Sequence, residues 1–114
     1  MSDDVASGIV PRAKLLVAMF DARDEWHGEP LHEALVRVLE AHGVAGASVF
    51  TGVGGYGAHR RVHRKGLIGF PRDKPAAVLV IDSEASIRAV LPTIRRMVAQ
   101  GIVVLTDAEI IPLK

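Results

Sequence analysis

Residues 76–105, AAVLVIDSEASIRAVLPTIRRMVAQGIVVL, contain the pattern that decides the fold. The stretch opens on the apolar run 76–81, which is typical of a buried strand. It continues with apolar residues at helical spacing, namely Ile87, Val90, Leu91, Ile94, Met97 and Val98. It closes on the apolar run 102–105. The stretch therefore predicts a strand, a helix and a strand in direct succession.

The ends of this predicted helix carry recognisable signals. Asp82 or Ser83 can cap its N-terminus by accepting a hydrogen bond from a backbone N–H of the first turn. Pro92 lies inside the helix, removes a backbone hydrogen bond and crowds the carbonyl of Arg88, so we expect a kink there. Gly101 is expected to cap the C-terminus.

The same alternation appears upstream. Residues 14–20, KLLVAMF, are a nearly continuous apolar run and predict a first strand. A polar loop follows, and Pro30 suits the first position of a helix because its missing N–H would be unpaired there in any case. Helical spacing then connects Leu31, Ala34, Leu35, Val38 and Leu39. Gly43 is expected to end this helix in the left-handed conformation, before a second strand over residues 44–50.

The C-terminal residues complete the element order. Residues 102–105 and 109–113 supply the last strand material, with Thr106 and Asp107 as a turn or bulge between them. The order strand, helix, strand, strand, helix, strand is that of an α+β, ferredoxin-like βαββαβ fold. We therefore expect a four-stranded antiparallel sheet with two helices on one face.

The predicted strands 14–20 and 76–81 are apolar on both faces. One face packs on the helices, and the other also needs cover. Self-association through the open face would supply it, and so would a long loop that folds back over the sheet. The residues favour an oligomer but leave its number open.

Length and composition set further bounds. The chain has 114 residues, 49% hydrophobic and 24% charged, which fits one domain, with a formal net charge of +1 and no cysteine. We expect a flexible N-terminal tail over residues 1–11 and a single domain over residues 12–114. The tail lacks the features of a signal peptide, and no apolar run reaches the roughly 18 residues of a membrane helix. These features predict a cytoplasmic protein.

The segment 52–75 contains the most informative residues for function. It opens with a cluster of glycines and continues with the basic residues Arg60, Arg61, Arg64, Lys65, Arg72 and Lys74. Glycines allow the backbone to approach a ligand, successive N–H groups can cradle an anion, and arginine forms bidentate contacts with phosphate. We therefore expect this long loop to contact a phosphorylated ligand, with a flexible, solvated loop as the alternative.

Two nucleotide-binding folds are disfavoured by the same residues. Residues 52–57, GVGGYG, match G-x-G-x-x-G, but the sequence that follows is interrupted by Gly66, Gly69 and Pro71 and leaves no room for a crossover helix. The chain also lacks the G-x-x-x-x-G-K-[ST] pattern of a P-loop.

Other chemistry-bearing residues favour structural roles. His59 and His63 are four residues apart, as two metal ligands on one helical turn would be. A zinc site requires three or four ligands, so this pair alone is not enough. Asp21, Asp24 and Glu25 are interpreted as a solvated loop rather than an acid–base pair. Trp26, in the same loop, would cover a ligand or a neighbouring subunit, or serve as a hydrophobic anchor. Without a nucleophile beside a base, the chain is not expected to be an enzyme.

Residues 27–63 resemble the family known as domain of unknown function 190, whose members are similar to PII signal-transduction proteins. The resemblance rests on Pro30-Leu31, on residues 43–49, on the glycines of residues 52–57 and on Arg61-Val62-His63. Residues 80–87, VIDSEASI, and the tail GIVVLTDAEII extend it to about residues 12–112. Two departures are Thr51, where many members have a basic residue, and the more basic residues 70–75.

The resemblance implies a PII-like homotrimer that binds an adenine nucleotide (ATP, ADP or AMP) or a similar phosphorylated molecule between subunits. The loop over residues 52–75 would report the ligand to a regulated partner protein. Carried over by position, the ligand-binding candidates are Gly52, Gly54, Gly55, Gly57, Arg60, Arg61 and His63.

Two alternatives remain open at the level of sequence. A divalent-metal-binding protein of CutA-like architecture would use His59, His63 or Asp21 as ligands. A nucleic-acid-binding module would use the basic loop, although few stacking aromatics lie nearby and the net charge is small.

Overall fold

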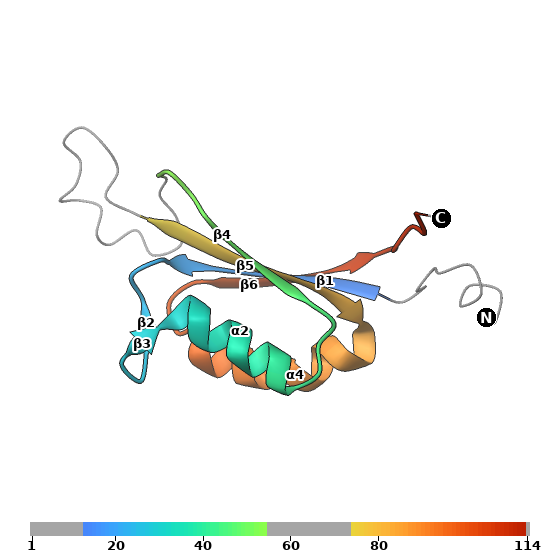
Figure 1. Ribbon diagram of the computed structural model, residues 1–114, viewed down its shortest axis with the longest axis horizontal. Coiled ribbons are helices and arrows are strands. Elements are labelled where there is room, and N and C mark those ends of the chain that lie inside the picture. Colours follow the sequence, from blue (N-terminus) through green and yellow to red (C-terminus); the bar gives the residue numbers. More distant parts are fainter. Residues whose placement is uncertain (1–12, 55–73, 114) are drawn as a thin grey trace.

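The computed structural model describes residues 13–54 and 74–113, and its core is a four-stranded sheet with two helices on one face. The strands are β1 (Ala13–Asp21), β4 (Ala47–Thr51), β5 (Pro75–Ser83) and β6 (Ile102–Ala108). Their order is β4-β5-β1-β6, and every pair is antiparallel. Helices α2 (Leu31–Ala41) and α4 (Glu84–Met97) lie side by side against the sheet (Figure 1). The predicted ferredoxin-like α+β fold is confirmed.

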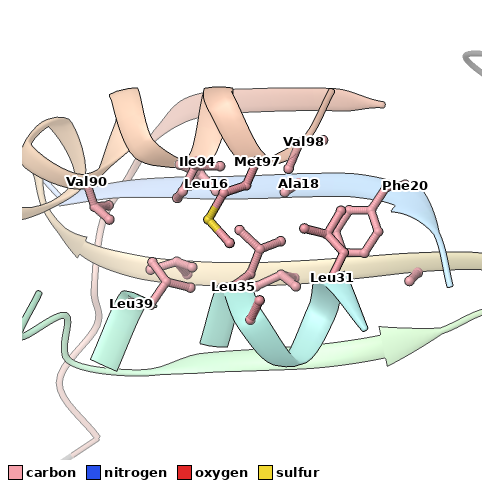
Figure 2. Close-up of a cluster of buried hydrophobic side chains, with 14 of the residues drawn as sticks. Leu16, Ala18, Phe20, Leu31, Leu35, Leu39, Val90, Ile94, Met97 and Val98 are labelled. Atoms are coloured by element: carbon pink, nitrogen blue, oxygen red, sulfur yellow. The ribbon is translucent and has the colours of Figure 1, made fainter. Parts of the chain in front are cut away.

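The core lies between the sheet and the helices (Figure 2). Strand β1 contributes Leu16, Ala18 and Phe20, which alternate with side chains on the opposite face as the pleat requires. The helices contribute apolar side chains at spacings of three and four residues, among them Leu31, Leu35, Leu39, Val90, Ile94 and Met97. Burial of each leucine or isoleucine stabilises the fold by about 1.5–3 kcal/mol.

Two of the predicted caps, Gly43 after α2 and Ser83 before α4, follow the sequence signals. Gly43 has a φ of +78°, and its N–H donates to the carbonyl of Glu40 at 3.0 Å, which ends α2 as predicted. Ser83 is the N-cap of α4 and accepts a 3.2 Å hydrogen bond from the backbone N–H of Ser86. Asp82 has another partner, because its carboxylate accepts from the backbone N–H of Ala45 at 2.9 Å.

The predictions for Pro30 and Pro92 have different outcomes. Pro30 is the residue before α2 rather than its first helical residue, so that prediction was wrong by one position. Helix α4 continues through Pro92 to Met97, and the kink expected there stays a prediction.

The prediction that Gly101 caps α4 was wrong. The helix ends at Met97 with Val98 as its C-cap, and the Val98 N–H donates to the carbonyl of Ile94 at 2.9 Å. Gly101 instead allows a close backbone approach, because a Cβ atom there would lie 2.2 Å from the carbonyl oxygen of Met19. A side chain cannot fit at that distance.

The predicted turn or bulge at Thr106 and Asp107 was also wrong. Strand β6 runs through both residues, which pair with Leu15 and Lys14 of β1. The Lys14 Nζ donates to Asp107 Oδ1 at 2.6 Å, so the polar residues are accommodated within the ladder. Residues 109–113 form no strand.

The sequence missed a small hairpin between β1 and α2. Strands β2 (Glu25–Trp26) and β3 (Glu29–Pro30) pair across a tight turn. Both central residues, His27 and Gly28, have positive φ angles of 50° and 85°. This turn places positive φ at both central positions, as tight hairpins prefer.

Among residues 13–54 and 74–113, no helix covers the face of the sheet opposite α2 and α4 (Figure 1), and this face carries exposed apolar side chains. The register aligns Met19 with Ala77 and Ile102 on its two neighbours, and it aligns Val17 with Leu79 and Val104. Met19 is 44% exposed, and Phe50, opposite Ala77, is 56% exposed. We call the surface formed by Leu15, Val17, Met19, Phe50, Ala77, Leu79, Ile81, Ile102 and Val104 the open apolar face.

None of the helices in residues 13–54 and 74–113 has the length and apolar character needed to cross a membrane.

Candidate functional site

The 52–75 segment leaves and rejoins the sheet between β4 and β5, and its two ends are held together. The N–H of Gly52 donates to the carbonyl of Pro75 at 2.7 Å, one position beyond the Thr51–Ala76 pair. A Cβ atom on Gly52 would lie 2.8 Å from Cγ of Pro75, so a larger residue would push against the proline ring. Gly52 therefore lets the two strands close at this point.

The turn after β1 joins the same place. Asp21 pairs with Pro75 in the β1–β5 register, and the N–H of Ala22 donates to the carbonyl of Lys74 at 2.7 Å. Residues from three parts of the chain thus meet at one end of the sheet. We call this junction, made of residues 21–24, Gly52 and residues 74–75, the segment base.

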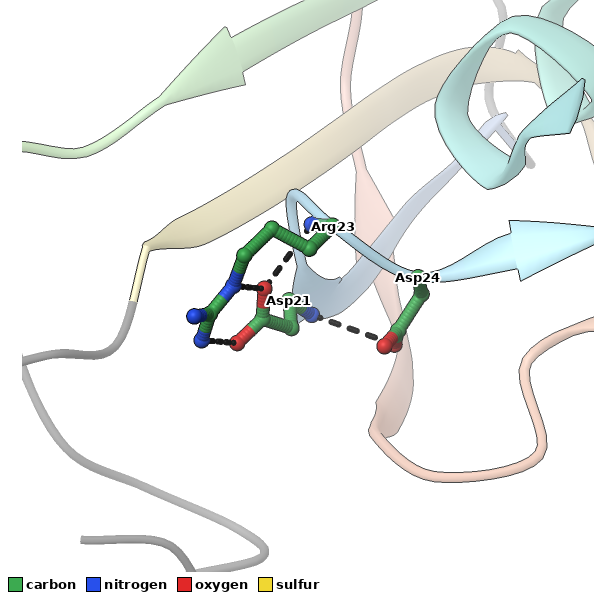
Figure 3. Close-up of polar contacts among 3 residues, drawn as sticks. All are labelled: Asp21, Arg23 and Asp24. Atoms are coloured by element: carbon green, nitrogen blue, oxygen red, sulfur yellow. Dashed lines mark hydrogen bonds and ion pairs between the residues drawn. The ribbon is translucent and has the colours of Figure 1, made fainter. Parts of the chain in front are cut away.

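The turn at the segment base holds a charged cluster (Figure 3). Arg23 donates from Nε to Asp21 Oδ1 at 2.8 Å and from Nη2 to Asp21 Oδ2 at 2.7 Å, which is a bidentate pair. The backbone N–H of Arg23 donates to the same Oδ1 at 2.8 Å. Asp24 Oδ2 accepts from the backbone N–H of Asp21 at 3.3 Å, on the other side of Asp21. The Asp21 carboxylate is therefore held from the side chain and from the backbone.

From the sequence we expected Asp21 and Asp24 to belong to a solvated loop, and Arg23 was not identified as a residue of interest. A signal was available, since an aspartate that follows a strand often bonds to the backbone N–H two residues later. The Asp21–Arg23 contacts follow that pattern. No local sequence pattern predicts that this cluster lies next to Lys74, because that contact depends on the pairing of β1 with β5.

The structure describes only part of the predicted ligand set. Gly52 lies at the segment base, and Gly54, half-buried, is the last described residue before the gap. The remaining predicted ligand residues lie outside the described residues: Gly55, Gly57, Arg60, Arg61 and His63. His59, named as a candidate metal ligand, is also outside them.

Trp26 serves as a hydrophobic anchor. It is half-buried and packs against the core, and its ring stacks on His27 with centroids 4.3 Å apart and planes 16° from parallel. Next to it, a cavity of about 240 Å³ is lined by Asp24, Glu25, Leu31, Met97, Ala99 and Gln100. The hairpin thus closes the end of the core at which the segment base lies (Figure 1).

A metal site finds no support in residues 13–54 and 74–113. Within residues 13–54 and 74–113, no group of three or more His, Cys, Asp or Glu side chains could hold a metal ion. Asp21, a candidate ligand, has its carboxylate bound by Arg23. Away from the segment base, the hydrogen bond and the charge of Glu29 raise the pKa of Arg37.

Comparison with known proteins places the chain among uncharacterised relatives. The family model DUF190, described as "Uncharacterized ACR", matches residues 13–110. A UPF0166 protein of Aquifex aeolicus is 31% identical over 99 residues, covering 86% of this chain and 93% of the relative. A UPF0166 protein of Methanocaldococcus jannaschii is 27% identical over 100 residues, covering 87% and 92%.

Solved structures share the fold. CPII, a nitrogen regulatory PII-like protein from Thiomonas intermedia K12 bound to ADP, AMP and bicarbonate, has a TM-score of 0.60 at 15% identity. The match covers 90% of this chain and 97% of CPII. A PII-like signaling protein from Thermus thermophilus has a TM-score of 0.57 at 17% identity, covering 90% and 92%. At these identities the likeness shows a shared fold.

Proposed function

This chain belongs to the DUF190 family, and on that premise we propose that it is a PII-like regulatory protein that binds an adenine nucleotide or a similar phosphorylated small molecule. The ligand binds where subunits meet, near the segment base, and the 52–75 segment reports its presence to a protein target. Residues 12–114 form the single domain that does this.

The observation that carries the proposal is the position of the 52–75 segment. Its ends are fixed at the sheet by the Gly52–Pro75 and Ala22–Lys74 hydrogen bonds. The sequence of residues 52–75 is rich in glycine and arginine. CPII, which shares the fold, is bound to ADP and AMP, and this supports an adenine nucleotide as the ligand here.

The proposed ligand residues are those of the glycine and arginine cluster: Gly52, Gly54, Gly55, Gly57, Arg60, Arg61 and His63. Glycines permit backbone N–H groups to face an anion, and arginine pairs with phosphate oxygens in a bidentate manner. His63 donates a further hydrogen bond to phosphate. Binding would change the contacts that the segment offers to a protein target, which is how ligand-dependent loops often serve as switches.

The open apolar face supports self-association, and the resemblance to PII-like proteins is the ground for proposing three copies. Its side chains form an apolar surface over β5, β1 and β6, with Phe50 of β4 beside Ala77. An exposed apolar surface of this kind marks an interaction site. Other copies of the chain would cover it and would bring the segment bases of neighbouring subunits into the ligand site. The protein then acts as a sensor and not as an enzyme.

Calorimetric titration with ATP, ADP, AMP and cyclic AMP, with and without magnesium, tests the proposal. Saturable binding of one of them, near one molecule per subunit, is the expected result. Bicarbonate is a useful fifth titrant because CPII is bound to it together with nucleotides. Absence of heat with all four nucleotides, confirmed by unchanged thermal stability, would overturn the nucleotide proposal.

A further inference from the structure

We propose that residues 109–113, EIIPL, form an arm that packs on the open apolar face of a second copy of this chain. We call these residues the exit segment. The inference rests on the proposed function for the self-association of the chain. It adds a named occupant for part of the open apolar face.

The exit segment displays apolar side chains that its own copy does not cover. Ile111 is 60% exposed and Leu113 is 94% exposed, whereas Ile110 is half-buried. Single apolar residues at a surface are ordinary, but here two large aliphatic side chains are separated only by Pro112. An exposed apolar group of this kind marks a contact with another surface.

Pro112 influences how these side chains are presented. A proline favours an extended conformation in the residue before it, here Ile111. Alternate side chains of an extended chain point the same way, so Ile111 and Leu113 share one face. Proline also has no N–H to donate to a β-ladder, and residues 109–113 lie outside any strand. The segment is therefore better suited to apolar packing than to the extension of a sheet.

The direction of the exit segment brings it to the open apolar face. Strand β6 is an edge of the sheet and contributes Ile102 and Val104 to that face. Figure 1 shows the chain after β6 continuing past the end of the sheet, toward the side opposite α2 and α4. The segment thus points beyond its own sheet, on the side where the open faces of two copies would meet.

The open apolar face offers a matching surface. Five of its side chains are between 42% and 56% exposed, namely Met19, Phe50, Ile81, Ile102 and Val104. Packing of the exit segment against them removes apolar area from water on both sides of the contact. Every copy carries both surfaces, so in a closed symmetric assembly each copy gives one arm and receives one. A second copy is therefore the partner that this surface fits.

Substitution of the two exposed side chains tests the contact and removes no residue. The double variant Ile111→Ser/Leu113→Ser should raise the dissociation constant of the assembly about tenfold or more, because full burial of one such side chain corresponds to about that factor. Sedimentation equilibrium without nucleotide measures it. The matched control is Ala85→Ser/Ala89→Ser, which changes exposed positions on α4 and should assemble like the wild type. Circular dichroism should show the same fold for both variants, since all four positions are exposed.

A second measurement locates the surface on which the arm packs. The chain has no cysteine, so Glu109→Cys gives a single attachment point for a nitroxide label and keeps both apolar side chains. Nitroxide-labelled chains are unfolded and refolded together with isotope-labelled chains that carry no nitroxide. Relaxation enhancement in the isotope-labelled chains is then intermolecular. We expect it to be strongest at the strand residues that form the open apolar face, and to be lost when Ile111→Ser/Leu113→Ser is added to the nitroxide-labelled chain.

The outcomes are separate from those of the proposed function, because neither measurement uses a nucleotide. Weaker assembly of Ile111→Ser/Leu113→Ser in a protein that binds no nucleotide would support the arm and remove the nucleotide proposal. Wild-type assembly of this variant together with normal ADP binding would overturn the arm, assign the exit segment to a different partner and leave the proposed ligand in place. Enhancement that is strongest in α2 and α4 would also overturn it, as would a wild-type chain that is monomeric at every concentration.

Discussion

The backbone N–H of Ala22 donates a 2.7 Å hydrogen bond to the carbonyl of Lys74. This bond ties the turn after β1 to the residue that precedes β5, and the β2–β3 hairpin with Trp26 follows that turn directly. A change at the end of the 52–75 segment therefore has a short path through the backbone to the hairpin.

Trp26 should report ligand binding. It is the single tryptophan of the chain, so the intrinsic emission comes from the hairpin. We expect ADP to change this emission with the same midpoint as the calorimetric titration, because the Ala22–Lys74 bond links the hairpin to the segment base. His27→Ala, which removes the stacked ring, should alter the starting emission but not the midpoint. Calorimetric binding with no change in emission would show that the two regions are uncoupled.

Arg60 and Arg61 should account for much of the nucleotide affinity. The double substitution Arg60→Ala/Arg61→Ala is expected to weaken ADP binding by more than about tenfold, since each charge-assisted hydrogen bond contributes roughly 1.5–3 kcal/mol. Circular dichroism should show an unchanged fold. Arg95→Ala/Arg96→Ala, an adjacent exposed pair on α4, removes the same charge and should bind like the wild type. Equal affinities in the two double variants would remove Arg60 and Arg61 from the site.

Met19 should be essential for assembly. Met19→Asp places a carboxylate in the centre of the open apolar face, where burial of an unpaired charge costs about 3 kcal/mol or more. Sedimentation velocity should show a monomer in place of the proposed trimer. The protomer should stay folded because position 19 is already 44% exposed in it. Ala89→Asp, on the exposed side of α4, is the control and should sediment like the wild type; a Met19→Asp trimer would show that the subunits associate through another surface.

Gly101 should tolerate no side chain. A Cβ atom there would lie 2.2 Å from the Met19 carbonyl and 3.0 Å from Cγ1 of Val98, so Gly101→Ala must shift the backbone of β1 or of the α4–β6 connection. We expect a loss of about 2–3 kcal/mol in the free energy of unfolding, which is the upper part of the range for overpacked sites. Urea denaturation measures it.

Gly46→Ala is the control for this substitution, because a Cβ at Gly46 meets no atom within 4 Å and its φ is not positive. Its free energy of unfolding should stay within about 0.5 kcal/mol of the wild type. If Gly101→Ala were as stable as Gly46→Ala, the close approach to Met19 would not constrain position 101.

Local signals predicted the elements whose cause is local. Apolar spacing placed both helices, and Gly43 and Ser83 were placed correctly as caps, since each acts within one turn of its own helix. The element order then led to the ferredoxin-like topology. These features depend on residues a few positions apart and can be read from the chain directly.

Where the prediction failed, distant residues had decided the outcome. Thr106 and Asp107 suggest a turn by composition, yet pairing with β1 holds them in a strand. Gly101 suggests a helix cap, yet the carbonyl of Met19 is the reason for a glycine there. In both cases a backbone from another part of the chain sets the constraint, and no local pattern can express it.

The sequence by itself determined the fold class, the positions of the helices, the apolar character of both sheet faces and the concentration of glycine and arginine in residues 52–75. Only the tertiary structure decided that Asp21, Arg23 and Lys74 share one end of the sheet. The physical reason is that hydrophobic periodicity specifies which residues form an element and which side they bury. The long-range hydrogen-bond register of β1 against β5 then specifies which polar residues at the ends of those elements become neighbours.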